Sequence, residues 1–144
     1  SAPSHEGSAW AGLDTYMTPI WLEEFARLRP LLDEERDAFT RLQLQIAPRC
    51  GYVRLVVAGI TAGVAMGVIE RGWLGIYDVI VEPALRGQGY GRQIMLHLMA
   101  WGAAQGASHA YLQVMANNAP ALQLYKGLGF KNVYSYWYRQ KYAF

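Results

Sequence analysis

The stretch LRGQGYGRQIML, residues 85–96, places glycines at 87, 89 and 91 and continues directly into an apolar, helix-forming segment. Before it, residues 73–81 are short and apolar enough for a central strand, which Pro83 ends. Glycine allows positive φ and carries no side chain, so successive N–H groups can converge on an anion at a helix N-terminus. Arg86 and Arg92 add positive charge. We therefore expect a phosphate-bearing ligand at this loop, with a tight turn that binds nothing as the alternative.

Two familiar nucleotide-binding motifs do not fit the loop. A Walker A loop requires Lys and then Ser or Thr after its last glycine, whereas Gly91 is followed by Arg92 and Gln93. A dinucleotide fingerprint requires a third glycine three positions beyond Gly89, where Arg92 stands, and an acidic residue further on to hold a ribose. No acidic residue follows Glu82. The loop therefore predicts neither nucleoside triphosphate hydrolysis nor dinucleotide binding.

Periodicity predicts the order helix, helix, three strands, helix, strand, helix, two strands. Thr18 and Pro19 are typical of a helix N-cap and first helical position. The strand, helix, strand unit within residues 73–115 needs a right-handed crossover and therefore a parallel strand pair. The fold class is α/β with a mixed sheet. The expected helices span 19–29, 33–47, 91–104 and 120–128, and the expected strands span 52–58, 63–70, 73–81, 110–115, 130–133 and 135–140.

Length and composition bound the class of protein. A chain of 144 residues with 53% hydrophobic content fits one globular domain, which we assign to residues 14–144, with residues 1–13 as an N-terminal linker or extension. The chain holds one cysteine, Cys50, expected to be a small buried side chain. No apolar run approaches the roughly 20 residues that span a bilayer, so we expect a cytoplasmic protein without a membrane partner. Six basic residues after Glu82 suit a small polyanionic ligand better than nucleic acid.

Two segments carry a resemblance to a known family. The segment VIVEPALRGQGYGRQIM, residues 79–95, resembles the acetyl-CoA signature of the GNAT N-acetyltransferases. Its core is Arg or Gln, two residues, Gly, one residue, and Gly or Ala, which Arg86, Gly89 and Gly91 fill. The segment NNAPALQLYKGLGF, residues 117–130, is similar to the second signature of the family, through its Asn118, Tyr125, Gly129 and Phe130. The resemblance extends over about residues 15–140.

The resemblance implies a mixed, mostly antiparallel sheet with a splayed central parallel strand pair, flanked by helices. It implies acetyl-CoA as co-substrate and no metal. Pantetheine is expected to pair with the strand backbone, the pyrophosphate to lie on the glycine loop, and a strand N–H near Val81 to stabilise an oxyanion. Asn118 is expected to hydrogen-bond the pantetheine arm, and Tyr125 to protonate the leaving thiolate. The cofactor-binding residues so implied are Val79, Ile80, Val81, Arg86, Gly87, Gln88, Gly89, Tyr90, Gly91, Arg92, Asn118 and Tyr125.

The acceptor side departs from the family pattern. Some relatives carry a Glu general base where this chain has Gln113, which cannot accept a proton. Asp78 on the central strand is our first candidate, either as base or as partner of the amine's charge, with a salt bridge or hydrogen bond as the alternative. Glu82 is expected outside the site. Tyr134 and Tyr136 are expected to bind the acceptor, with sheet packing or a dimer edge as the alternative.

The functional hypothesis is direct acetyl transfer, in a ternary complex, from acetyl-CoA to a primary amine of a small molecule or peptide. The alternative is a non-catalytic domain that binds coenzyme A within a larger two-domain protein. In some relatives this domain follows another one, so we expect either a homodimer or packing against an N-terminal domain. Nucleic-acid binding is not expected, because the charge is modest and unclustered.

Overall fold

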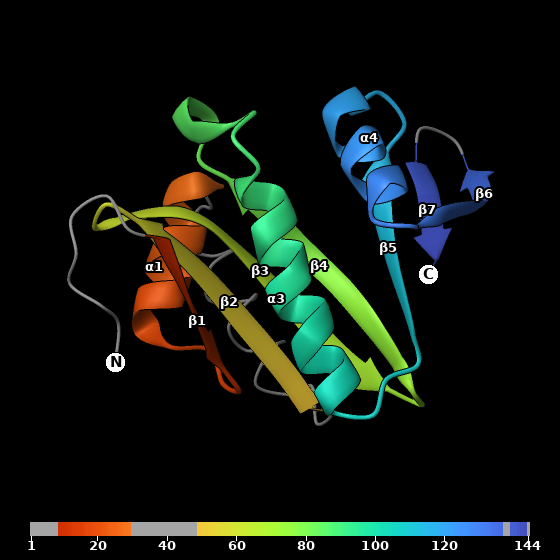
Figure 1. The fold of residues 1–144 in the computed structure, drawn as a ribbon, viewed down its shortest axis with the longest axis horizontal. Coiled ribbons are helices and arrows are strands. Elements are labelled where there is room, and N and C mark those ends of the chain that lie inside the picture. Colours follow the sequence, from red (N-terminus) through yellow and green to blue (C-terminus); the bar gives the residue numbers. More distant parts are fainter. Residues whose placement is uncertain (1–8, 30–48, 137–138, 144) are drawn as a thin grey trace.

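The computed structural model describes residues 9–29, 49–136 and 139–143, and the helix expected between 33 and 47 lies outside them. These residues form a seven-stranded sheet in the order β1-β2-β3-β4-β5-β7-β6 (Figure 1). The strands are β1 (Ala9–Asp14), β2 (Arg49–Val57), β3 (Ile60–Glu70), β4 (Trp73–Val81), β5 (His109–Met115), β6 (Lys131–Tyr136) and β7 (Arg139–Ala143). The helices are α1 (Pro19–Leu28), the short 3-10 helix η1 (Pro83–Leu85), α3 (Tyr90–Ala104) and α4 (Ala119–Gly127).

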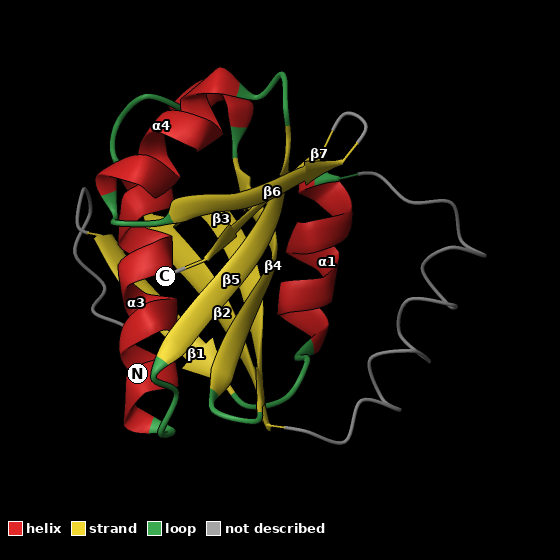
Figure 2. Cartoon of the chain, turned by 90° about the vertical axis from the view of Figure 1, so that its right-hand side faces the viewer, coloured by secondary structure: helices red, strands yellow, loops and turns green. Residues whose placement is uncertain are grey.

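One strand pair of the sheet is parallel. The chain leaves β4, passes through η1 and α3, and returns as β5 beside β4, while every other described pairing is antiparallel. This confirms the mixed sheet and the parallel pair predicted for residues 73–115. Figure 2 shows α1 and α3 on opposite faces of the sheet. None of the helices in the described part of the chain is long and apolar enough to cross a membrane.

The first strand corrects the predicted boundary of the domain. Residues 9–13, assigned to a linker, belong to β1, which pairs with β2 from Ala9–Val57 to Asp14–Tyr52. Its side chains alternate between the two faces of the sheet: Leu13 packs against the core beneath α3, whereas Trp10 lies 5.3 Å from the guanidinium of Arg54. Small residues interrupt this alternation in the sequence, so the composition resembled a linker.

The two C-terminal strands also differ from the prediction. We expected a break at Tyr134, but β6 extends from Lys131 to Tyr136, with a shift of its register against β7 between Asn132 and Tyr134, and β7 begins at Arg139. β7 lies between β5 and β6, so β6 forms the edge of the sheet. An alternating aromatic pattern runs from β6 to β7 in the sequence, so periodicity does not show where one strand ends and the next begins.

Each face of the sheet has its own hydrophobic core. On the α1 face, the buried Trp21 ring stacks on Phe25 at 5.3 Å and meets Tyr52 edge-on at 5.1 Å. The Trp21 Nε1–H donates to the carbonyl oxygen of Val53 at 3.0 Å, which fixes α1 to β2. Cys50 is buried in the same cluster, as predicted, and burial raises the pKa of its thiol. On the other face, Ile94, Met95 and Leu98 of α3 are fully buried against the sheet.

Near the start of β3, Gly63 is packed so closely that it cannot be replaced without strain. A Cβ on Gly63 would lie 2.7 Å from the carbonyl oxygen of Ile80 and 2.6 Å from Cδ1 of Ile94. Gly63 pairs with Val81, so this contact sets the distance between β3 and the last residues of β4. A rigid backbone atom cannot move aside as a flexible side chain can.

We expect Gly63→Ala to lower the free energy of unfolding by about 1–3 kcal/mol, the usual cost of overpacking. Gly127→Ala is the matched control, because a Cβ there would have nothing within 4 Å, and alanine favours the helix by up to about 1 kcal/mol. Urea denaturation of both variants measures the difference. Equal stabilities of Gly63→Ala and wild type would contradict the close contact.

Candidate functional site

The parallel pair at the centre of the sheet separates half-way along its length. β4 and β5 pair from Trp73–His109 to Ile76–Leu112. In the described register, β4 beyond that point pairs with β3, and β5 pairs with β7. The backbone of β4 after Ile76 is therefore open on its β5 side. This confirms the splayed strand pair that the family resemblance implied.

A bulge on β4 lies where the strands separate. The register between β3 and β4 shifts between Val64 and Met66, so that Ala65 faces both Asp78 and Val79. Asp78 has a φ of 55°, in the left-handed region that residues other than glycine rarely adopt. Strain of this kind costs about 1–3 kcal/mol and is concentrated at functional sites. The bulge thus places the Asp78 carboxylate beside the opening between β4 and β5.

A cavity of about 520 Å³ lies between the glycine loop, the end of β4 and α4. Its volume is within the range of small-molecule sites, roughly 300–1,000 Å³. The cavity brings together all the residues predicted to hold the cofactor except Gln88, and adds residues of α1 and α4. The residues that line it are Leu28, Arg29, Val79, Ile80, Val81, Leu85, Arg86, Gly87, Gly89, Tyr90, Gly91, Arg92, Asn118, Pro120, Ala121, Leu124 and Tyr125.

The glycines of the loop serve two different purposes. Gly87 and Gly89 have φ of 79° and 83°, and a Cβ on either would point into open space. Gly89 is the N-cap of α3, so the first N–H groups of the helix lie beside the cavity. Gly87 and Gly89 place no side chain in front of them. The expectation of positive φ is wrong for Gly91, which lies inside α3. Its missing Cβ instead lets α3 approach α4, since a Cβ there would be 3.2 Å from Leu124 Cδ2.

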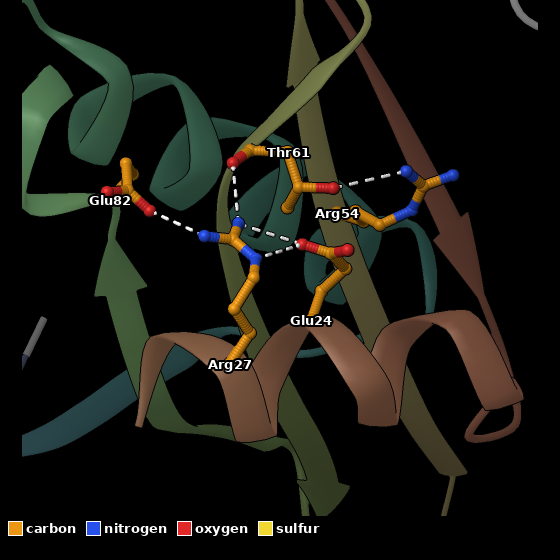
Figure 3. A network of polar contacts seen from close by, with 5 residues as sticks. All are labelled: Glu24, Arg27, Arg54, Thr61 and Glu82. Carbon is orange, nitrogen blue, oxygen red and sulfur yellow. Dashed lines mark hydrogen bonds and ion pairs between the residues drawn. The ribbon is translucent and has the colours of Figure 1, made fainter. Parts of the chain in front are cut away.

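A polar network centred on Arg27 holds the end of α1 against the start of the loop (Figure 3). Its guanidinium donates to Glu82 at 2.7 Å, to Glu24 at 2.9 Å and to the carbonyl oxygen of Thr61 at 3.2 Å. Arg54 donates to the Thr61 hydroxyl at 3.3 Å. The bonds to Glu82 and Glu24 raise the pKa of Arg27. Glu82 is thus engaged outside the linings of the two cavities, as predicted, and the network fixes α1 where its last residues form the cavity wall.

A second cavity, of about 420 Å³, opens between β4 and β5 on the other side of the splay. It shares Arg29, Val79, Ile80, Asn118 and Tyr125 with the first cavity. On the α4 side, the two cavities therefore meet at the N-cap and the last turn of the helix. The other residues that line it are Ile76, Tyr77, Asp78, Tyr111, Leu112, Gln113, Val114 and Met115.

The shared residues on α4 are held by the fold. Asn118 is the N-cap of the helix, and its Oδ1 accepts from the Ala121 N–H at 3.3 Å. Tyr125 is 7% exposed, and its ring meets Phe130 edge-on at 6.1 Å. Burial raises the pKa of the Tyr125 hydroxyl to about 12, so the hydroxyl carries its proton at neutral pH. The arrangement provides a neutral O–H donor where the two cavities join.

Asp78 is the acidic residue in the lining of the second cavity. Its Oδ1 lies 3.2 Å from Nη1 of Arg29, and its side chain is 20% exposed. Burial raises the pKa of the Asp78 carboxyl, and the positive charge of Arg29 partly opposes this shift. A carboxyl of raised pKa is a stronger base than a solvated aspartate.

Two aromatic side chains, Tyr77 and Tyr111, line the second cavity. The hydroxyls of Tyr77 and Tyr111 lie 2.8 Å apart, and the Lys141 ammonium is 4.5 Å from the centre of the Tyr111 ring. Tyr111 reaches Tyr77 by crossing Gly75, where a Cβ would be 2.8 Å from its hydroxyl. Tyr134 and Tyr136 belong to β6 by their backbone, but their side chains lie outside the described part of the structure.

Comparison with known proteins agrees with this geometry. Residues 15–130 match a family model described as the acetyltransferase (GNAT) family. The protein belongs to the GNAT family. The matched range extends from the loop before α1 to the end of the second signature, and so includes all the described residues that line the two cavities.

Individual relatives are similar over parts of their length. The uncharacterized N-acetyltransferase YobR of Bacillus subtilis is 28% identical over 85% of this chain and 49% of its own. Streptothricin acetyltransferase of Streptomyces lavendulae is 38% identical over 55% of this chain and 43% of its own. The chain thus spans about half the length of the curated relatives it matches. The PaiA N-acetyltransferase of Thermoplasma acidophilum, solved in complex with coenzyme A, shares the fold, with a TM-score of 0.71 at 13% identity over 93% of this chain and 98% of that one.

Some residues of this GNAT site escaped the sequence analysis. Leu28 and Arg29 lie at the end of α1, and Arg29 is 49 positions before its partner Asp78, so no local pattern connects them. Tyr77 and Tyr111 did leave a signal, since both stand on the strand face opposite the buried residues. Aromatic side chains on the open face of two neighbouring strands could have predicted them.

Proposed function

We propose that the protein is an acetyl-CoA-dependent N-acetyltransferase that transfers the acetyl group directly to a primary amine in a ternary complex. One observation carries the proposal: two cavities, one beside a basic glycine loop and the other containing a carboxylate, meet at Tyr125 across the open β4–β5 gap. Direct transfer needs both substrates bound at once with their reacting atoms in contact. The catalytic domain is proposed to include all of β1, Ala9–Asp14, and so to begin earlier than the predicted residue 14.

The residues of the first cavity fit acetyl-CoA. The loop from Arg86 to Arg92, including Gln88, offers bare backbone N–H groups and two guanidinium groups to the pyrophosphate. The backbone of Val79, Ile80 and Val81, open on its β5 side, can pair with the amides of pantetheine as an added strand would. Asn118 is proposed to hydrogen-bond the same arm. A solved relative of the same fold that binds coenzyme A supports this assignment.

The chain's own groups supply the proton and charge stabilisation that the transfer needs. Acetyl-CoA provides an acetyl group activated as a thioester, which an unprotonated amine attacks to form the C–N bond as the C–S bond breaks. A strand N–H near Val81 is proposed to donate to the carbonyl oxygen while it carries negative charge. The Tyr125 hydroxyl, protonated at neutral pH, donates its proton to the departing sulfur.

The second cavity is proposed to receive the acceptor. An alkylamine has a pKa of roughly 10 and arrives as an ammonium, so a group must hold its charge and then accept a proton. Asp78 is proposed to do both, since Gln113 lines the cavity but cannot take a proton. Tyr134 and Tyr136 of β6 are proposed to border the acceptor. A relative named for acetylating streptothricin supports a small-molecule amine, and a peptide amine stays open.

Binding of acetyl-CoA tests the loop. We expect Gly89→Trp to abolish binding, because the indole would fill the space in front of the first N–H groups of α3. Gly72→Trp is the matched control, since Gly72 also has positive φ and open space but lies in the β3–β4 turn. Isothermal titration calorimetry with acetyl-CoA measures both. Unchanged affinity in Gly89→Trp would refute the loop assignment.

Thiol release with a panel of small-molecule and peptide amines tests catalysis. We expect Tyr125→Phe to lower kcat by about 100-fold or more, because the departing thiolate loses its proton donor. Tyr142→Phe, at a buried tyrosine outside both cavity linings, should retain activity. Binding of acetyl-CoA without turnover of any amine would favour the non-catalytic coenzyme A-binding domain instead.

The pH profile of kcat/KM tests Asp78. With Asp78 as base, activity should rise with pH through the pKa of Asp78, which burial places above its usual 3.8, and then level off. In Asp78→Asn the reactive amine must lose its proton to solvent, so activity should keep rising toward the amine's own pKa of roughly 10. Asn tolerates the left-handed backbone of this position about as well as Asp. Superimposable profiles would rule out the base.

A further inference from the structure

The ion pair between Arg29 and Asp78 lies where the two cavities meet. Arg29 is the C-cap of α1, and its guanidinium lies 3.2 Å from the Asp78 carboxylate. Arg29 lines both cavities, whereas Asp78 lines the second. The guanidinium therefore lies against one oxygen of the carboxylate that another cation in the second cavity would contact.

The two partners of this pair differ in freedom to move. Asp78 is set in the β4 bulge with a side chain that is 20% exposed, while the Arg29 side chain is 62% exposed. The backbone of Asp78 is fixed by the pairing of β4 with β3, whereas the long, flexible side chain of Arg29 extends from the end of α1. If the pair opens, Arg29 is the partner that leaves.

A neighbouring cation stabilises the charged form of the largely buried Asp78 carboxylate. Leaving a buried charge uncompensated is far more costly than exchanging one partner for another. Arg29 can therefore leave Asp78 at little cost when another cation replaces it, but not when a neutral molecule does. The pair discriminates between ligands by charge.

We propose that Arg29 is an internal competitor of the acceptor: the acceptor's ammonium replaces the Arg29 guanidinium on Asp78. Arg29 is then a specificity-determining residue that admits alkylamines, which are cationic at neutral pH, and disfavours weakly basic amines such as anilines. This inference rests on the proposed function for its assignment of the second cavity to the acceptor. It adds a residue and an acceptor class to that proposal.

Binding of a probe amine tests the exchange without any turnover. The chain contains four aspartates, so NMR of protein with carbon-13 in its aspartate carboxyls is tractable, and Asp78→Asn assigns the Asp78 signal. Titration with n-butylammonium chloride should shift that signal in wild type. In Arg29→Gln the same titration should give a Kd roughly threefold lower, the scale of an exposed ion pair, because no guanidinium competes. Neutral n-butanol should leave the signal unchanged.

Three variants separate competition from a loss of structure. Arg29→Lys keeps a competing cation and should bind butylammonium with wild-type affinity. Arg49→Gln removes a positive charge that instead bonds to Gln105, and should also match wild type. In Arg29→Gln without amine, the pKa of Asp78 should rise, since the cation that lowers it is gone.

Several results would overturn the inference. Equal Kd values in wild type and Arg29→Gln, or weaker binding in Arg29→Gln, would show that Arg29 does not compete. A shift by n-butanol as large as that by butylammonium would show that charge does not matter. This test measures binding at Asp78 and not turnover. If the protein acetylates no amine in the panel, the proposed function fails, but the binding test still decides whether Arg29 competes.

Discussion

The separation of β4 from β5 is the constraint on which the rest of the site depends. Two parallel strands that paired along their full length would satisfy each other's backbone groups and leave no room for a ligand. The bulge at Asp78 alters the course of β4 just beyond Ile76, the last residue of β4 paired with β5, while β3 keeps its own pairing with β4. Both cavities open along the resulting gap.

The elements around the gap are held by interactions of different kinds. Close packing of backbone against backbone, with no side chain between, sets the distance between β3 and β4 at Gly63. Polar contacts set the position of α1, through Arg27 and Glu82. Surface ion pairs are individually weak, so the contribution of Arg27 lies in aligning the end of α1 more than in stability.

Local patterns in the sequence were sufficient for most of the architecture. The spacing of apolar residues, together with helix caps and prolines, located α1, β4, α3 and the parallel pair, because these signals act over a few residues. They failed for β1, where small residues mask the alternation, and for the boundary between β6 and β7, where the aromatic alternation continues in the sequence from one strand to the next. In both places a strand is defined by its pairing partner more than by its own composition.

The sequence by itself determined the family signatures, with the glycine spacing of the loop and the positions of Asn118 and Tyr125, because each depends on spacing within one segment. Tertiary structure alone decided that Arg29 meets Asp78, that Tyr111 reaches Tyr77 across Gly75, and that Gly91 lies close to Leu124 and lacks a positive φ. These contacts join segments far apart in the chain. No local pattern encodes them, since they arise only when the sheet and its helices are assembled.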